Sequence, residues 1–337
     1  MPRRRLAIIG ALLLVPIVGF LLTRIALDTD AGEDVVATIS PTSTTEATTS
    51  TTVASATTSE APTTTTSATS ATPTTTQPAG TNPATSPLPS IPRPGEPTAA
   101  TDAAGLAEQI RTAEAAIADP TTSPNELTSQ AHRQQVAYRA LVNDPTRKAA
   151  TFELLTPELR AIAEANVTAG GKLRSMIKTP KTSLPPWRIV APAPPAELLG
   201  YYKQAETDLG VPWYHLAAIH LVETRMGRIR GNSEANAQGP MQFLPATWAQ
   251  YGNGGDIQSN KDAIAAAARY LKRNGAPGDM RNAVFNYNHD NRYVDAVLAY
   301  GERMKADERA YYGYHQWQVY YVTTVGDVWL PEGYAAG

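Results

Sequence analysis

Residues 222–248 read VETRMGRIRGNSEANAQGPMQFLPATW and join the end of an apolar helical pattern to a loop rich in Gly, Asn and Gln. The residues before the loop predict a helix that Pro212 opens and Gly227 closes. Leu216, Ile219 and Glu223 fall at positions i, i+3 and i+7 of this helix, so their side chains share one face. The sequence therefore predicts a carboxylate on the apolar stripe of a helix, close to its end.

A carboxyl group on an apolar face is costly unless it is paired or has a function. Loss of hydration raises the pKa of such a group, and a carboxyl with a raised pKa can act as a general acid near neutral pH. Glu223 is therefore the candidate catalytic residue. The structural alternative is that Glu223 lies at a fraying helix end or forms an ion pair with one of the nearby arginines, Arg225, Arg228 and Arg230.

Helical patterns extend through residues 195–310, joined by loops of Gly, Asn and Pro. Over 261–274, Ile264 and Leu271 belong to a buried stripe, Asn260 is expected to cap the helix, and Gly275 is expected to stop it. This region contains no run of alternating apolar and polar residues typical of strands. The predicted fold class is mainly α.

Residues 101–180 also follow a helical pattern, with Leu106 and Ile110 on one face and Gly170-Gly171 expected to interrupt the last helix. They carry no recognisable chemistry, and we interpret them as a helical spacer. A Pro-rich crossing leads to the domain 181–337, which we expect to fold alone. Its tail is expected to pack on this domain because its aromatic residues would otherwise be exposed, namely Trp317, Trp329 and Tyr334.

The first 100 residues predict a different organisation. Three arginines precede an apolar run from Leu6 to Leu22, which predicts an uncleaved membrane anchor within 1–30 with a cytoplasmic N-terminus. A cleaved signal peptide is the alternative, and both interpretations export the rest of the chain. Residues 31–100 are rich in Thr, Ser, Ala and Pro and are too poor in large apolar side chains to form a core, which predicts a disordered linker.

Composition excludes several classes of function. The chain has 337 residues, a formal net charge of -2 and no cysteine. The near-neutral charge gives no support for nucleic-acid binding. The absence of cysteine excludes disulfides and thiolate sites, and the absence of a His-Glu-x-x-His motif disfavours a zinc hydrolase. We expect no cofactor.

Three short motifs occur in a fixed order along the domain. They are ETRMG with Glu223, QGPMQFLPATW with Gly239, Met241 and Gln242, and FNYNHDNRYVDAVLAY with Asn286, Tyr287 and Asn288. Together with KDAIAAAARYLKRNG between the last two, they resemble the lysozyme-like lytic transglycosylases of bacterial cell walls over residues 195–305. The residues of these motifs are more similar to the transglycosylase B type of this family than to its soluble type. The tail resembles that of actinobacterial members of the family.

The resemblance implies a lysozyme-like helical catalytic domain that acts on the glycan strands of peptidoglycan. In this family one Glu protonates the glycosidic oxygen of the MurNAc-GlcNAc β-1,4 bond and then deprotonates the 6-hydroxyl of the substrate. That hydroxyl attacks the anomeric carbon and leaves a 1,6-anhydro-muramyl end without consuming water. An attacking group within the substrate has a high effective concentration, so a second carboxylate is not required. The sequence specifies no partner among other cell-wall enzymes.

Two alternatives stay open. A muramidase of the same fold would use water and normally a second carboxylate, for which Glu234, Asp256 and Asp290 are candidates. A non-catalytic peptidoglycan-binding scaffold would depend mainly on the helices of 101–180. Relatives of the transglycosylase B type often carry a calcium loop after the Trp, but YGNGGDIQSNKD lacks the acidic ligand series, so we expect no metal.

The other motif residues have functional and structural interpretations. Gln242 would donate to a sugar or N-acetyl oxygen, or simply fix the loop. Tyr287 would stabilise developing positive charge or orient Glu223, or pack in the core with its hydroxyl bonded. Asn286 and Asn288 would contact the glycan or cap a turn. The remaining members of the predicted substrate site are two residues of the loop, Gly239 and Met241.

Overall fold

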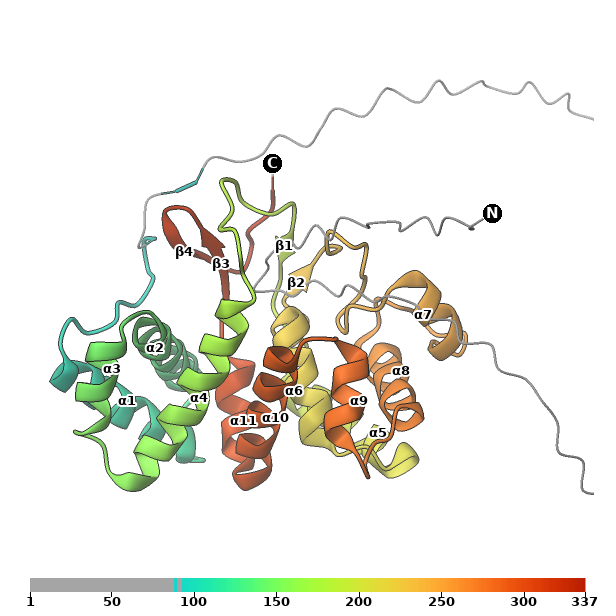
Figure 1. The fold of residues 1–337 in the computed structure, drawn as a ribbon, viewed down its shortest axis with the longest axis horizontal. Helices are drawn as coiled ribbons and strands as arrows, with labels where there is room; N and C mark the ends of the chain where they lie inside the picture. Colours follow the sequence, from blue (N-terminus) through green and yellow to red (C-terminus); the bar gives the residue numbers. More distant parts are fainter. Residues whose placement is uncertain (1–87, 90–92, 337) are drawn as a thin grey trace, which may run out of the picture. The chain divides into compact units, whose positions relative to one another are not determined.

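The structure is a computed structural model and describes residues 88–89 and 93–336. The predicted anchor at 1–30 and nearly all of the predicted linker at 31–100 lie outside the described residues. Within 93–336, none of the helices combines the length and apolar character that crossing a membrane requires. The described chain is mainly helical, as the sequence predicts (Figure 1).

The helices fall into two sequential groups (Figure 1). The first group comprises α1 (Ala103–Ala118), α2 (Pro124–Asn143), α3 (Pro145–Phe152) and α4 (Pro157–Ser175). The second comprises α5 (Pro195–Leu209), α6 (Trp213–Thr224), α7 (Pro245–Tyr251), α8 (Asn260–Arg273), α9 (Met280–Tyr287), α10 (Asn291–Ala306) and α11 (Glu308–His315).

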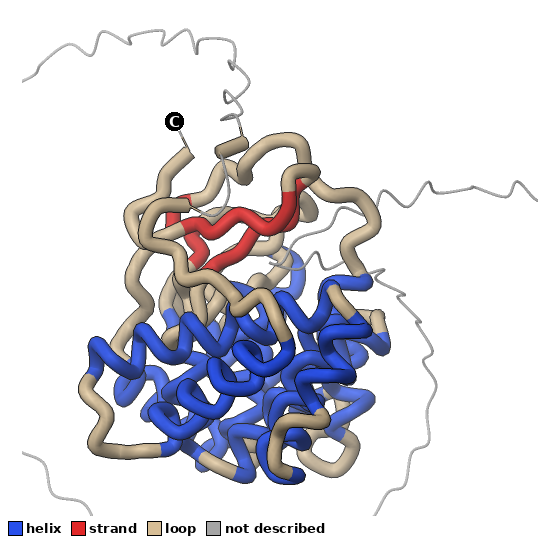
Figure 2. Tube along the Cα trace, turned by 90° about the vertical axis from the view of Figure 1, so that its left-hand side faces the viewer, coloured by secondary structure: helices blue, strands red, loops and turns tan. Residues whose placement is uncertain are grey.

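Two short antiparallel sheets complete the described chain, and Figure 2 shows their strands gathered at one end of the helical body. β1 (Arg188–Ile189) pairs with β2 (Ile229–Arg230), and β3 (Val319–Thr323) pairs with β4 (Gly326–Leu330). The sequence did not predict the β3–β4 hairpin, although VYYVT is rich in the β-branched and aromatic residues that favour strands. The tail packs partly on the predicted domain and partly on the predicted spacer: Tyr334 donates to the carbonyl of Pro185, whereas Trp317 donates to Gln134 of α2 and the Trp329 ring lies against His132 of α2.

Local signals set most helix boundaries, with two corrections. The side chain of Ser259, rather than that of Asn260, caps α8 by accepting a hydrogen bond from the backbone of Asp262. Gly170-Gly171 does not interrupt its helix, since α4 runs unbroken from residue 157 to 175. Packing of α4 against α2 and α10 outweighs the low helix propensity of the two glycines.

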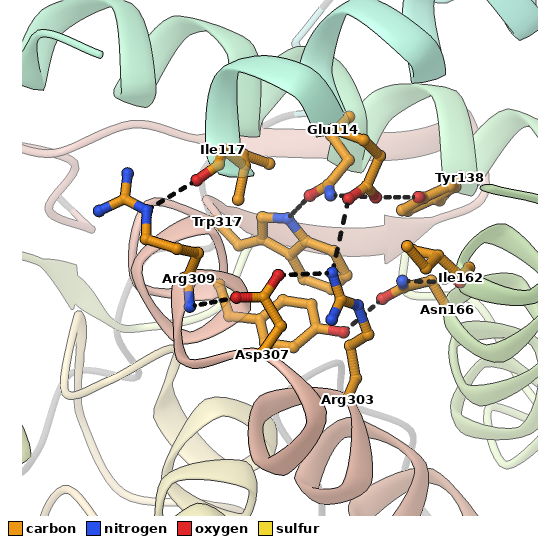
Figure 3. Close-up of polar contacts among 11 residues, drawn as sticks. Glu114, Ile117, Tyr138, Ile162, Asn166, Arg303, Asp307, Arg309 and Trp317 are labelled. Atoms are coloured by element: carbon orange, nitrogen blue, oxygen red, sulfur yellow. Dashed lines mark hydrogen bonds and ion pairs between the residues drawn. The ribbon is translucent and has the colours of Figure 1, made fainter. Parts of the chain in front are cut away.

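A single hydrophobic core extends from α1–α4 into α5–α11, because α10 packs against α4 on one side and α6 on the other. A buried polar network also joins the two groups of helices (Figure 3). Glu114 accepts hydrogen bonds from the amide of Gln134 at 2.7 Å and from the hydroxyl of Tyr138. The indole of Trp317 donates to Gln134 at 2.8 Å, and Arg303 lies 4.0 Å from Glu114. The predicted boundary at residue 180 thus divides a shared core.

Because the core is shared, we expect the fragment 181–337 to be less stable than the longer chain. Removal of α1–α4 would expose the face of α10 that packs on α4 and leave the buried indole of Trp317 without its acceptor. We therefore expect 181–337 to unfold at a clearly lower urea concentration than 93–337, measured by circular dichroism. Equal midpoints would restore the interpretation of residues 101–180 as a separate spacer.

Candidate active site

Glu223 lies in the last turn of α6 and is only 1% exposed. Leu216 and Ile219 are fully buried on the same helix, which confirms the predicted apolar face. Each of the three nearby arginines has a contact of its own: Arg225 donates to the carbonyl of Leu221, Arg228 pairs with Glu332, and Arg230 donates to the carbonyl of Gln258. Glu223 is therefore a buried carboxyl at a well-formed helix end.

Tyr293 holds the Glu223 carboxyl in place. Its hydroxyl donates a hydrogen bond to Oε1 of Glu223 at 2.6 Å, and its ring is fully buried near the start of α10. Such a bond favours the ionised carboxylate, whereas burial favours the neutral acid. The sequence did not assign this role to Tyr293. The available signal was its place on the apolar face of α10, together with Val294 and Val297.

The Gly-Pro-Met-Gln loop is held by hydrogen bonds from the ends of α6 and α9. The hydroxyl of Thr224 donates to the carbonyl of Pro240 at 2.6 Å, and the hydroxyl of Tyr287 donates to the carbonyl of Met241 at 2.6 Å. Gly239 has φ +72°, and a Cβ atom there would lie 1.9 Å from the carbonyl oxygen of Ile257. This position requires glycine because of both its conformation and its close backbone contact.

Gln242 and Glu223 line one small cavity, so the structure brings two predicted site residues together. The amide nitrogen of Gln242 donates to the carbonyl of Gly239 at 3.0 Å, which fixes the loop. The other lining residues are Trp187, Ile229, Gly231, Asn232 and Ser233. Among these described lining residues, Glu223 is the one carboxylate.

The remaining predicted residues are not part of the described lining of this cavity. Tyr287 is fully buried and supports the loop through Met241, which is itself a core residue. Asn286 is half-buried on α9, where its amide donates to the carbonyl of Asn282. Asn288 is buried, and its backbone ends α9 by donating to the carbonyl of Val284. The bonded hydroxyl of Tyr287 matches its structural interpretation, whereas the side-chain amide nitrogen of Asn288 is buried without a hydrogen-bond partner among the described residues.

The three candidate second carboxylates each have another partner. Glu234 forms an ion pair with Lys181 at 2.9 Å and is largely exposed. Asp290 caps α10, and its hydrogen bonds with Arg292 lower the pKa of its carboxyl despite partial burial. Asp256 accepts a hydrogen bond from the backbone of Gln258 at 2.9 Å. In the part of the chain that the structure describes, no cluster of three acidic or histidine side chains is placed to bind a metal ion.

Trp187 is a lining residue that sequence reasoning missed. The pairing of β1 with β2 places Arg188 opposite Arg230, which brings the Pro-rich crossing beside the loop that follows α6. A Cβ atom on Gly231 would lie 2.6 Å from the Trp187 ring, so glycine is needed for this close approach. Trp187 is only 5% exposed and its ring packs edge-on against Tyr321, so the indole forms an apolar wall of the cavity that Glu223 also lines.

No family model matches the chain, and neither a curated protein nor a solved structure is significantly similar to it. The functional interpretation therefore depends on the residues of this site.

Proposed function

We propose that the chain is a peptidoglycan lytic transglycosylase, a carbon-oxygen lyase with a lysozyme-like catalytic domain in residues 181–337. One observation carries the proposal. The carboxyl of Glu223 is buried at the end of α6, receives a hydrogen bond from Tyr293, and lines a cavity with Gln242 and Trp187. Burial of a carboxyl that lines a cavity favours an acid that can deliver its proton to a bound substrate.

In this proposal Glu223 first donates a proton to the substrate and then accepts one from it. Its neutral carboxyl protonates the glycosidic oxygen between MurNAc and GlcNAc, and the bond from that oxygen to the anomeric carbon breaks. The resulting carboxylate removes the proton of the substrate 6-hydroxyl, whose oxygen forms the new bond to the anomeric carbon. The products are a free hydroxyl on GlcNAc and a 1,6-anhydro-muramyl end, and Glu223 is again neutral.

The composition of the cavity supports a lyase over a muramidase. A hydrolase normally places a second carboxylate across the cleavage site to activate water or to attack the sugar. The described lining residues besides Glu223 are neutral, and Glu234, Asp256 and Asp290 are engaged elsewhere. An attacking hydroxyl within the substrate removes the need for that second group.

The proposed localisation follows from the first 100 residues. Residues 1–30 would anchor the chain in the cell membrane with a cytoplasmic N-terminus, and residues 31–100 would tether the catalytic domain outside. Protease added to intact cells from which the outer wall layers have been removed should then degrade the helical region. Full protection, with recovery of the chain in the cytosol, would contradict both the localisation and the wall substrate.

Release of soluble muropeptides from purified peptidoglycan tests whether the protein is an enzyme. The full-length protein should release them with time, because Glu223 provides the acid that the leaving oxygen needs. Binding to peptidoglycan without release would instead favour the scaffold interpretation.

The contact between Tyr293 and Glu223 predicts the effect of Tyr293→Phe. Loss of a hydrogen bond to a charged group costs about 1.5–3 kcal/mol, so we expect the rate of muropeptide release to fall about 10- to 100-fold. Because the lost bond favours the ionised carboxylate, the pH dependence of the release rate should also shift to higher pH.

Tyr314→Phe is the matched control. It removes a buried hydroxyl that donates to Asn166 at 2.7 Å, remote from the lining of the Glu223 cavity. This variant should lose stability but keep the wild-type pH profile. A Tyr293→Phe variant with an unchanged rate and pH profile would show that Tyr293 does not position the acid.

A further inference from the structure

A second cavity, of about 50 Å³, lies among α2, α4, α10 and the β3–β4 hairpin. One part of its wall is apolar, formed by the side chains of Val142 and Leu173 and the rings of Tyr138, Tyr300 and Trp317, and the rest is polar or charged. Figure 3 shows Tyr138 held to Glu114, and Trp317 is fixed by its bond to Gln134. The cavity is therefore enclosed by side chains that have fixed positions.

A buried arginine points into this cavity. Arg225 is only 6% exposed, and its side chain forms part of the lining. Within the described residues, Nη1 donates to the carbonyl of Leu221 at 2.7 Å, while Nε has no partner. The bond to Leu221 contributes to the end of α6 but uses one of five guanidinium donors.

Arg225 remains positively charged at neutral pH. The pKa of its guanidinium is lowered to about 10, mainly by burial, with Tyr300 opposing the shift and the nearby positive charge of Arg139 adding to it. That value is still well above neutrality. A buried cation without a counterion is unfavourable, so an anion in the cavity would stabilise this arrangement.

The carboxylate of Asp327 does not supply this counterion. It forms ion pairs with Arg139 and with Arg174, the latter at 2.6 Å. Three arginines and one aspartate line the cavity, which gives its described lining a net charge of +2. The next carboxylate, that of Glu114, is engaged by Tyr138 and Gln134. Excess positive charge thus remains around Arg225.

The cavity has an approach from the surface. An open groove lies between the segment 96–99 and α2, and it shares Arg139, Arg174 and Asp327 with the cavity. These three side chains form the boundary between the groove and the cavity. Gly170 keeps the interior open, since a Cβ atom there would lie 3.6 Å from Val142 and 3.9 Å from the hydroxyl of Tyr300.

We propose that this cavity binds a small organic carboxylate with a short apolar body, with Arg225 as the buried anchor for the carboxylate. The guanidinium offers planar paired donors that fit a carboxylate, and the apolar part of the wall fits the rest of the ligand. The proposal concerns a site separate from the Glu223 cavity and does not rest on the proposed enzyme activity.

Isothermal titration calorimetry of the full-length protein tests this proposal with three probes. N-acetylalanine should bind saturably, whereas N-acetylalaninamide should bind at least tenfold more weakly because it lacks the charge. Inorganic phosphate should also bind more weakly than N-acetylalanine because it gains nothing from the apolar part of the wall. Equal binding of the amide or of phosphate would contradict a carboxylate with an apolar body, and no saturable binding of N-acetylalanine would overturn the site.

Two variants test whether N-acetylalanine binds in the cavity that Arg225 lines. Arg225→Met removes the charge at similar length, and Gly170→Leu fills the cavity while keeping every charge. Each should weaken the binding of N-acetylalanine about 10- to 100-fold. Gly171→Leu is the matched control, because Gly171 lies next to Gly170 on α4 but is not part of the described lining. If Arg225→Met fails to fold, Gly170→Leu alone decides, and wild-type affinity in that variant would refute the proposal.

Discussion

Glu223→Gln is expected to lower the rate of muropeptide release by about 10²- to 10⁴-fold, the usual effect of losing a general acid. The loss should lie at the upper end of this range because the same group also acts as the base in the second step. The protein should remain folded, since the oxygen of Gln can still accept the hydrogen bond from Tyr293. Binding to insoluble peptidoglycan should therefore persist while release stops.

Glu234→Gln is the control for this prediction, because Glu234 is the nearest alternative carboxylate along the chain. Its side chain is largely exposed and paired with Lys181, so its neutralisation should leave most of the activity. Near wild-type cleavage by Glu223→Gln, or an inactive Glu234→Gln, would move the catalytic carboxyl from α6 into the loop.

Gly239→Ala is expected to produce the largest loss of stability at the site. A residue with a side chain in the left-handed conformation costs about 1–3 kcal/mol, and Gly239 has φ +72°. In addition, the new Cβ atom would lie 1.9 Å from the backbone carbonyl of Ile257, so the loop would have to move. Because the next residues carry the contacts to Thr224 and Tyr287, movement of the loop should also reduce activity.

Gly200→Ala provides the matched control. Gly200 lies within α5, and a Cβ atom there would meet no atom within 4 Å. Alanine favours a helix interior over glycine by about 0.5–1 kcal/mol, so this variant should be slightly more stable and fully active. Urea unfolding of both variants measures the difference. A Gly239→Ala variant as stable as the wild type would show that the loop is not held as described.

Local sequence patterns predicted the features that depend on neighbouring residues. The apolar face of α6 and the place of Glu223 on it follow from helical spacing. The resemblance implied that Gln242 and Glu223 share a site, and both residues line one cavity. The bond from Thr224 to the loop holds the two segments together. The tail also packs, as its aromatic residues required, but partly on the predicted spacer.

Contacts between distant residues could not be predicted in the same way. Tyr293 lies 70 positions after Glu223, and nothing local distinguishes its hydroxyl from that of Tyr287. Trp187 reaches the cavity only because β1 pairs with β2. The continuity of α4 through Gly170-Gly171 depends on tertiary packing, which can outweigh helix propensity.

The mass of the muramyl ends released from purified peptidoglycan tests the central claim most directly. The account predicts that the full-length protein produces 1,6-anhydro-muramyl ends, which are one water lighter than reducing ends, because the substrate hydroxyl replaces water as the attacking group. Mass spectrometry of the products should show these ends as the main species, and Glu223→Gln should form almost none. Reducing ends as the main product would contradict the account and identify a muramidase that activates water.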